Sequence, residues 1–189
     1  MTQPRIGFIG IGMMGHGMAK NLLAKGFPLT FMVHRDRSRI ADLVALGAKE
    51  AKTPAQVAAQ SDVVILCVTG SPQVEQNVFG DGGLLGAARP GLTIVDTSTA
   101  EPGSTAKVRD ALAAKGTTLV DAPLARTPKE AEEGRLNTMV GASEADFERL
   151  KPVFAAFCEN IFHVGPPGAG HTLKLVNNFM AMTIVASIA

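Results

Sequence analysis

The sequence lacks a strong charge imbalance, a cysteine framework and any apolar run long enough to cross a membrane. Its 189 residues contain 18 lysines and arginines against 17 aspartates and glutamates, with two cysteines, Cys67 and Cys158. A net charge of +1 provides no basic surface for nucleic acid or anionic lipid. Both cysteines have apolar neighbours, so we expect buried free thiols in a reducing compartment rather than a disulfide. No apolar run approaches the roughly 20 residues that span a bilayer.

The N-terminus also lacks the basic and then apolar segment of a secretory signal. The opening "MTQPRIGFIGIG" becomes glycine-rich at once. We therefore expect a cytoplasmic globular protein without membrane or nucleic-acid partners, and none of its motifs indicates a metal site. With 46% hydrophobic residues, the chain can bury a substantial core.

Short β-rich runs alternate with helical segments along the chain. Residues 63–68 are apolar without alternation, as in strands that are covered on both faces. This order predicts an α/β fold with a Rossmann-type, doubly wound and mostly parallel sheet. The composition changes at "GPPGAG". We therefore expect one domain at residues 1–164, and a joint with the first part of a long helix at 165–189.

The first chemical motif is "GFIGIGMMGHG", with Gly10, Gly12 and Gly15 spaced as G-x-G-x-x-G between a strand and a helix. These glycines allow a tight turn, a close approach of a pyrophosphate and packing of the helix on the sheet. The free N–H groups at the helix start face the phosphate. The alternative is a glycine turn without a ligand, and we expect His16 to lie on the surface. The expected cofactor-binding residues here are Gly10, Ile11, Gly12, Met13, Met14 and Gly15.

The end of the second expected strand, "FMVHRDRSR", bears on the choice between NADP and NAD. NAD sites place a carboxylate about 20 residues beyond the glycine loop, for the ribose hydroxyl. Val33 stands at that point, and His34, Arg35 and Arg37 follow it. Guanidinium groups bind phosphate in a forked geometry, so we expect NADP(H) to be preferred over NAD(H). Alternatively, the arginines are the solvated start of the next helix.

The second motif is "GPPGAGHTLKLVNN", in which Lys174, Asn177 and Asn178 share one helical face at i, i+3 and i+4. Burying an ammonium and two amides among apolar neighbours is costly without a purpose. The structural alternative is that Lys174 extends its charge to solvent while the asparagines bond across helices.

Four motifs in order, "GFIGIGMMGHGMAKNLL", "VDTSTAEP", "VDAP" and "GPPGAGHTLKLVNN", resemble the β-hydroxyacid dehydrogenase family, which includes 3-hydroxyisobutyrate dehydrogenase. The resemblance covers the whole chain. It implies a Rossmann domain, followed by a long helix that leads into an all-helical domain, which we expect to be absent from this chain. From about Phe179 the last helix is apolar nearly all round, which an exposed helix cannot sustain. We therefore expect a homo-oligomer formed through this helix and the helical domain.

The resemblance also implies roles for individual residues. Lys174 corresponds to the family's catalytic residue, which exchanges a proton with the substrate during hydride transfer to or from a nicotinamide. Apolar neighbours would bring its pKa closer to the working range. The activity implied is that of an NAD(P)-dependent 3-hydroxyacid dehydrogenase or aldehyde-acid reductase. Alternatives are a dinucleotide-binding module without turnover and an imine reductase. Substrate contacts are implied for Ser98, Asn177 and Asn178, and cofactor contacts for Val68, Thr69 and Thr99.

The segment "VDAPLART" departs from the family pattern, in which Asp-Ala-Pro continues as Val-Ser-Gly-Gly. Replacing both glycines is expected to remove a backbone site for a carboxylate, while Arg126 supplies a charged fork for an anion. The segment is similar to the sulfolactaldehyde reductase branch, which has Gly-Arg-Thr here. We therefore expect Arg126 and Thr127 to bind a small anionic substrate. The alternative is that Arg126 is a surface residue paired with one of three acids, Glu130, Glu132 or Glu133.

Overall fold

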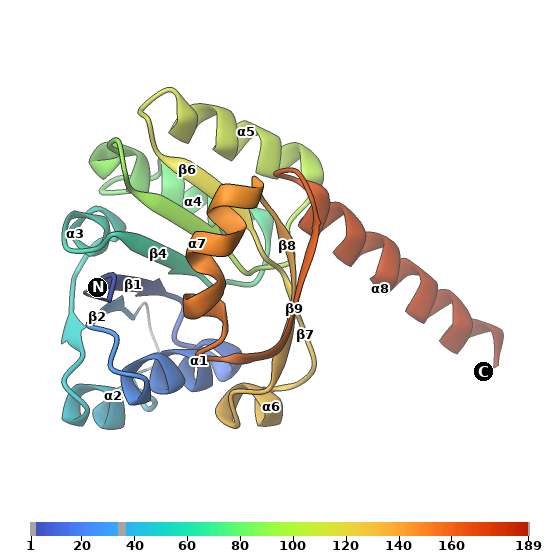
Figure 1. The fold of residues 1–189 in the computed structure, drawn as a ribbon, viewed down its shortest axis with the longest axis horizontal. Coiled ribbons are helices and arrows are strands. Elements are labelled where there is room, and N and C mark those ends of the chain that lie inside the picture. The colour runs from blue at the N-terminus through green and yellow to red at the C-terminus, as the bar shows by residue number, and fades with distance from the viewer. Residues whose placement is uncertain (1–2, 34–36, 189) are drawn as a thin grey trace.

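The computed structural model describes residues 3–33 and 37–188, which form a sheet between two layers of helices (Figure 1). The strands are β1 (Ile6–Ile9), β2 (Leu29–Met32), β3 (Lys49–Glu50), β4 (Val63–Leu66), β5 (Thr93–Asp96), β6 (Thr118–Asp121), β7 (Leu124–Ala125), β8 (Leu136–Gly141) and β9 (Cys158–Gly165). Their order is β3-β2-β1-β4-β5-β6-β8-β7, and β9 pairs with β8. Strands β1 to β6 pair in parallel. The predicted doubly wound, mostly parallel sheet is therefore confirmed.

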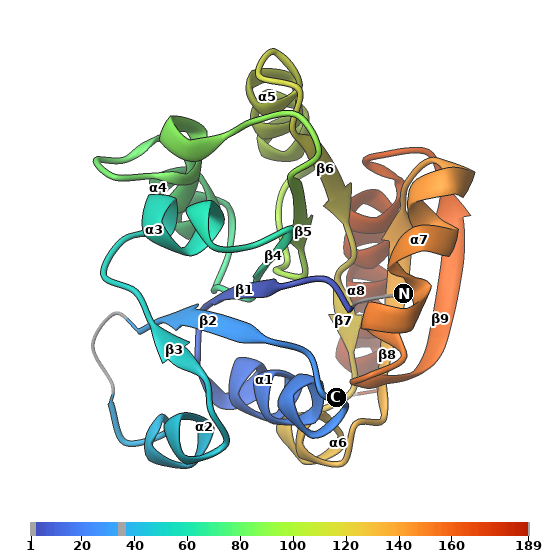
Figure 2. The same cartoon turned by 60° about the vertical axis from the view of Figure 1, so that its left-hand side comes forward.

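The helices divide between the two faces of this sheet. They are α1 (Met13–Ala24), α2 (Ala41–Ala45), α3 (Pro54–Ala59), α4 (Ser71–Phe79), the short 3₁₀ helix η1 (Leu84–Ala87), α5 (Pro102–Ala113), α6 (Pro128–Glu132), α7 (Glu144–Phe154) and α8 (Ala169–Ser187). Helices α1, α2, α6 and α7 share one hydrophobic cluster with the sheet, and α3, α4, η1 and α5 share the other. Figure 2 shows α1 and α2 on the opposite side of the sheet from α3 and α4.

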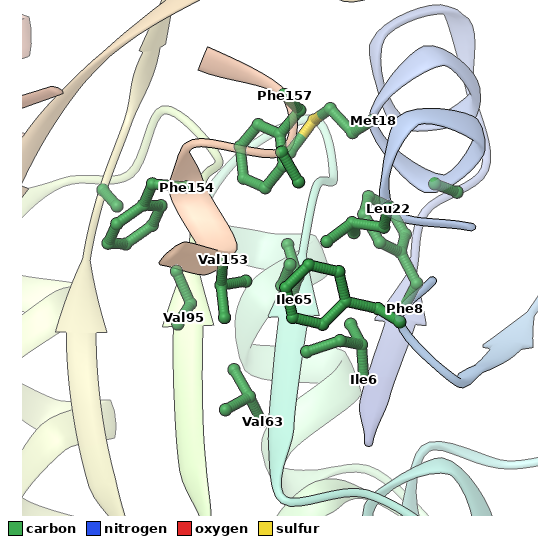
Figure 3. Packing of buried hydrophobic residues seen from close by; sticks show 14 of the residues in the cluster. Ile6, Phe8, Met18, Leu22, Val63, Ile65, Val95, Val153, Phe154 and Phe157 are labelled. Atoms are coloured by element: carbon green, nitrogen blue, oxygen red, sulfur yellow. The ribbon is translucent and has the colours of Figure 1, made fainter. Parts of the chain in front are cut away.

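The two-residue repeat of a strand explains how one apolar run supplies both cores. In β4, Val63 and Ile65 point to the cluster with α1 and α7, whereas Val64 and Leu66 point to the opposite cluster. Figure 3 shows Ile65 facing the side chains of α1 and α7. Each fully buried side chain of this size contributes about 1.5–3 kcal/mol relative to an exposed one.

Strands β7, β8 and β9 extend the parallel sheet with a mixed edge. Strand β8 runs antiparallel to β6 and β7, and β9 runs parallel to β8. The pairing places Asp121, at the end of β6, opposite Gly141, at the end of β8. Helix α8 begins beside this pair, because a Cβ on Gly170 would lie 2.7 Å from the carbonyl oxygen of Asp121.

Beyond its first turn, α8 projects away from the rest of the chain (Figure 1). Its buried residues are Gly170 and His171. Large apolar side chains along the rest of the helix are exposed, among them Phe179 at 72% and Met182 at 68%. An exposed apolar surface of this kind is typical of a face that contacts another part of a protein. None of the helices within the described ranges has the length and apolar character needed to cross a membrane.

Candidate active site

The glycine loop between β1 and α1 has the geometry that its spacing predicts. Gly10 has a φ of +107°, and a Cβ there would lie 2.1 Å from the carbonyl oxygen of Cys67. A Cβ on Gly15 would lie 2.0 Å from the carbonyl oxygen of Gly10. Gly12 differs, because a Cβ there would meet no atom within 4 Å. Gly10 and Gly15 are therefore required by the fold, while the open side of Gly12 leaves room for a ligand at the start of α1.

A cleft of about 820 Å³ lies in front of this loop. This volume is within the range of about 300–1,000 Å³ that small-molecule and cofactor sites occupy. The cleft brings together the predicted residues Gly10, Ile11, Gly12, Met13, Met14, Gly15, Val68 and Thr69. The cleft thus lies at the carboxyl ends of β1 and β4, where ligands of open α/β sheets bind.

Sequence patterns missed the opposite wall of the cleft, which consists of residues at the start of α3, residues along α4 and one residue just after α4. Its polar members are Lys52, Thr53, Gln73, Gln76, Asn77 and Asp81. No motif marks them. The one available signal is a proline in the first turn of each helix, Pro54 and Pro72, which marks the helix start. Each of these helices follows a parallel strand, so its start lies at the carboxyl edge of the sheet.

The residues expected at the ribose 2′ position are only partly described. His34 and Arg35 lie outside the described residues. The guanidinium group of Arg37 donates two hydrogen bonds of 2.8 Å to the carboxylate of Glu50, on β3. Arg37 is not among the residues that line the cleft. In this structure its charge is therefore matched by Glu50.

Ser98 and Thr99 follow β5 but have different surroundings. The backbone N–H of Val68 donates to Oγ of Ser98 at 3.1 Å, and the N–H of Ser98 donates to Oδ1 of Asp96 at 2.9 Å. Ser98 is buried and therefore ties the ends of β4 and β5 together. Thr99 is exposed and does not line the cleft.

Helix α8 is held to the sheet by a carboxylate from β6. Oδ1 of Asp121 accepts a hydrogen bond of 2.6 Å from the N–H of Gly168, and Oδ2 accepts one of 2.8 Å from the N–H of His171. The side chain thus satisfies helix-start donors and places a carboxylate at the positive end of the helix dipole. Gly168, with a φ of +99°, provides no side-chain cap of its own.

The candidate residues of α8 lie just beyond this anchor. Lys174 and Asn178 are half-buried, and Asn177 is exposed. Burial lowers the pKa of the Lys174 ammonium, because loss of solvent disfavours its charged form. Among the described residues, none accepts a hydrogen bond from the Lys174 side chain. The lysine is therefore available to a ligand and holds its proton less tightly than an exposed lysine does.

Arg126 has an unusual backbone conformation. Its φ is +85°, and it is the only non-glycine residue of the described ranges with a positive φ. An arginine therefore holds a conformation that favours glycine, which costs about 1–3 kcal/mol. Its guanidinium group pairs with Glu159 of β9 and donates to the carbonyl oxygen of Arg135. The partner is thus Glu159, not one of the three nearby acids that the surface alternative named.

Thr127 and His16 have structural partners. Thr127 caps α6: its hydroxyl donates to the Glu130 carboxylate at 2.5 Å and accepts from the N–H of Lys129 at 3.3 Å. His16, which we expected on the surface, is partly buried and does not line the cleft. Its side chain is only 12% exposed and lies between Glu132 and Asp42, at 2.5 Å and 2.9 Å.

Both cysteines are free thiols, as predicted. Cys67 lines the cofactor cleft, and burial raises its pKa to about 11. Burial raises the pKa of Cys158 to about 12. Neither sulfur therefore has the thiolate character of a nucleophile at neutral pH.

Comparison with known proteins places residues 5–165 in a family. The family described as the NAD binding domain of 6-phosphogluconate dehydrogenase matches residues 5–165. The chain is 42% identical over 185 residues to 2-(hydroxymethyl)glutarate dehydrogenase of Eubacterium barkeri, covering 98% of this chain and 61% of that protein. It is 34% identical over 182 residues to 3-sulfolactaldehyde reductase of Escherichia coli (strain K12), covering 96% and 60%.

A solved structure gives the same result. The chain superposes on 3-hydroxyisobutyrate dehydrogenase of Mycobacterium tuberculosis with L-serine, at a TM-score of 0.87 and 28% identity, covering 95% of this chain and 60% of that one. The chain thus spans less than two thirds of the length of these relatives. It belongs to the family of NAD binding domains of 6-phosphogluconate dehydrogenase, and its relatives are the β-hydroxyacid dehydrogenases that its four motifs indicate.

Proposed function

We propose that the full-length protein transfers a hydride between NADP(H) and a small hydroxy acid or aldehyde acid, with Lys174 as the proton donor and acceptor. The observation that carries this proposal is the pairing of an open glycine-loop cleft with a half-buried lysine of lowered pKa. The relatives named above are dehydrogenases and a reductase, which supports the same class of reaction.

The chain's own residues bind the dinucleotide and move the proton. When bound, the nicotinamide supplies the hydride chemistry. The N–H groups at the start of α1 hold the pyrophosphate, and the open side of Gly12 admits it. Val68 and Thr69, which line the cleft just beyond β4, would contact the cofactor. Thr99, which does not line the cleft, is proposed as a further cofactor contact.

Lys174 acts in opposite ways in the two directions. Its neutral amine takes the proton of the substrate hydroxyl during oxidation, and its ammonium gives a proton to the carbonyl oxygen during reduction. Asn178 lies one turn further along α8, where its amide holds the reacting oxygen or an acid group of the substrate. Ser98 and Asn177 complete the substrate contacts.

We expect Arg37→Ala to weaken NADPH binding about tenfold, the equivalent of one charge-assisted hydrogen bond, and NADH binding much less. Arg37, with His34 and Arg35, is proposed to bind the 2′-phosphate, and NADH has none. Dissociation constants for both cofactors test this. In the matched control Glu50→Gln, the acceptor of Arg37 loses its charge, so NADPH should bind more tightly. If Arg37→Ala weakened the binding of NADPH and NADH equally, Arg37 would not bind the 2′-phosphate.

The substrate is proposed to carry an acid group away from its reacting carbon, bound by Arg126 and Thr127. One relative is named for a glutarate and another for a sulfolactaldehyde, both of which are anionic. Arg126 already binds a carboxylate, that of Glu159. In the proposed complex, the acid group of the substrate replaces Glu159 as the partner of the guanidinium group.

Oxidation of NADPH and NADH by the full-length protein tests the proposed function. The substrates are short aldehydes that end in a carboxylate, a sulfonate, a phosphate or an uncharged group. We expect Arg126→Gly to raise KM for acid-tipped aldehydes about tenfold or more, because a charge-assisted pair is lost. Glycine retains the positive φ, so the backbone is preserved. The control Glu159→Gln should lower the same KM. An equal effect on charged and uncharged aldehydes would refute the anion site.

The same assay separates the alternative functions. If NADPH binds but no aldehyde consumes it, the chain is a binding module without turnover, or an imine reductase that consumes NADPH with a cyclic imine. Association into a homo-oligomer through the exposed apolar face of α8 is also part of the proposal.

A further inference from the structure

His171, in the first turn of α8, is buried completely and faces two polar groups of the Rossmann domain. Its Nδ1 lies 2.7 Å from Oγ1 of Thr105, on α5. Its Nε2 lies 3.9 Å from Oδ2 of Asp96, at the end of β5. Lys174 follows His171 at i+3, on the same side of the helix. The His171 side chain thus contacts α5 and approaches β5, and it stands three residues before Lys174 in the sequence.

The order hydroxyl, imidazole, carboxylate is that of a nucleophilic triad, but burial excludes this role. Thr105 is 4% exposed, His171 0% and Asp96 2%. A substrate has no access to the Thr105 hydroxyl, which also lies 3.1 Å from the carbonyl oxygen of Glu101. Any effect of these residues on a reaction must therefore be transmitted through the elements that they join.

The Asp96 carboxylate connects this cluster to the cofactor cleft. Its Oδ1 accepts from the N–H of Ser98, and Oγ of Ser98 accepts from the N–H of Val68, which lines the cleft. Its Oδ2 faces His171 Nε2, which has no hydrogen-bonding partner in the part of the chain that the structure describes. Burial raises the pKa of Asp96, while the nearby His171 and the hydrogen bonds from Ser98 act in the opposite direction. Hydrogen bonds therefore run from Val68 through Ser98 to Asp96, and a gap of 3.9 Å separates Asp96 from His171 in the first turn of α8.

The proton positions on His171 depend on the Thr105 hydroxyl. The carbonyl oxygen of Glu101 has two lone pairs and lies within reach of both the N–H and the hydroxyl of Thr105, so the hydroxyl has two acceptors to choose from, this oxygen and Nδ1. When the hydroxyl donates to Nδ1, the neutral imidazole carries its proton on Nε2, on the side of the Asp96 carboxylate. The separation of 3.9 Å is longer than a hydrogen bond, so the attraction is electrostatic and varies with the placement of α8.

We propose that His171 is a positioning residue, which sets the location of Lys174 relative to the cofactor cleft by joining α8 to Asp96 and Thr105. This inference rests on the proposed function of Lys174. The anchor at Asp121 binds two backbone N–H groups at the start of α8, those of Gly168 and His171. The contacts of His171 supply two further attachment points on other elements. Displacement of a reacting group by about 1 Å can cost a hundredfold in rate.

Two variants of the full-length protein separate the two contacts. The amide of His171→Gln can reach the position of Nε2 and keep the interaction with Asp96. The shorter amide of His171→Asn reaches only the position of Nδ1 and keeps the contact with Thr105. We expect His171→Asn to lower kcat about tenfold to a hundredfold with KM and the NADPH dissociation constant little changed, and His171→Gln to retain kcat within about threefold.

Amide hydrogen exchange of residues 171–178 in the NADPH complex provides a readout that does not depend on turnover. We expect faster exchange there in His171→Asn than in the wild type, and near wild-type exchange in His171→Gln. Unchanged exchange in both variants overturns the inference, as does a fall in kcat that is equal in both. If the wild type turns over no substrate, the proposed function fails, while the exchange data still decide whether His171 positions α8.

Discussion

Lys174→Ala is expected to lower kcat of the full-length protein about a thousandfold, the middle of the range for loss of a general acid or base. The loss should fall on kcat, because Lys174 does not line the cofactor cleft and NADPH binding does not depend on it. Lys174→Arg is the matched control: it keeps the positive charge but cannot release a proton near neutral pH, so it should also be inactive. Steady-state kinetics and NADPH titration provide both measurements. A Lys174→Ala variant that retains most of its turnover would rule out the proposed role.

The pH dependence of the same enzyme gives a second test of Lys174, with opposite signs in the two directions. Because burial lowers the pKa of Lys174, the neutral amine forms at lower pH than in an exposed lysine. The rate of oxidation, which needs the amine, should rise as pH rises through this lowered pKa. The rate of reduction, which needs the ammonium, should fall over the same interval. A profile with the same sign in both directions would contradict the assignment.

Asp121→Ala is expected to lower the free energy of unfolding by about 3 kcal/mol, because it leaves two N–H groups at the start of α8 without their charged acceptor. The carboxylate is 1% exposed and accepts from Gly168 and His171. The chain packs tightly against the Asp121 carboxylate, since a Cβ on Gly141 would lie 2.6 Å from Oδ1. Water therefore has little room to replace the lost acceptor. Urea denaturation measures the change.

The control for Asp121 is Asp121→Asn, which keeps one acceptor oxygen and should lose about half as much stability. Both variants should also lose turnover, because α8 carries Lys174 and depends on this anchor. A midpoint of unfolding for Asp121→Ala equal to that of the wild type would show that α8 is held by its other contacts.

Most of the fold could be predicted because its strongest signals are local. The strands β1, β4 and β5 are short apolar runs, and the glycine loop follows directly from its spacing. Strand β8 has no comparable signal, because polar residues such as Asn137 and Thr138 interrupt it and it lies in the antiparallel part of the sheet. Helix α4 has a weak signal, because its buried residues are only Val74 and Val78. Helix α6 has five residues, and its capping box at Thr127 and Glu130 was the available signal.

The candidate site could be predicted where one segment contains all its parts. Lys174 and the two asparagines share one helix, so their common face follows from their spacing, whereas their roles come from the resemblance to the β-hydroxyacid dehydrogenases and stay a prediction. The pairing of Arg126 with Glu159 joins residues 33 positions apart, and the anchor of His171 on Asp121 joins residues 50 apart. Such pairs depend on the order of strands in the sheet, which local patterns do not specify. The positive φ of Arg126 was missed because it opposes the preference of that residue.

The raised pKa values of the Cys67 and Cys158 thiols make this protein well suited to site-directed labelling at an introduced cysteine. At neutral pH, a thiol of pKa about 11 is ionised in only about one molecule in ten thousand, and the thiolate is the form that reacts with maleimides. Maleimides should therefore react very slowly with Cys67 and Cys158. A new cysteine at Val176, which is 49% exposed on α8, would then carry a fluorophore without prior removal of Cys67 or Cys158. Since the sequence contains no tryptophan or tyrosine, the background for such an optical reporter is very low.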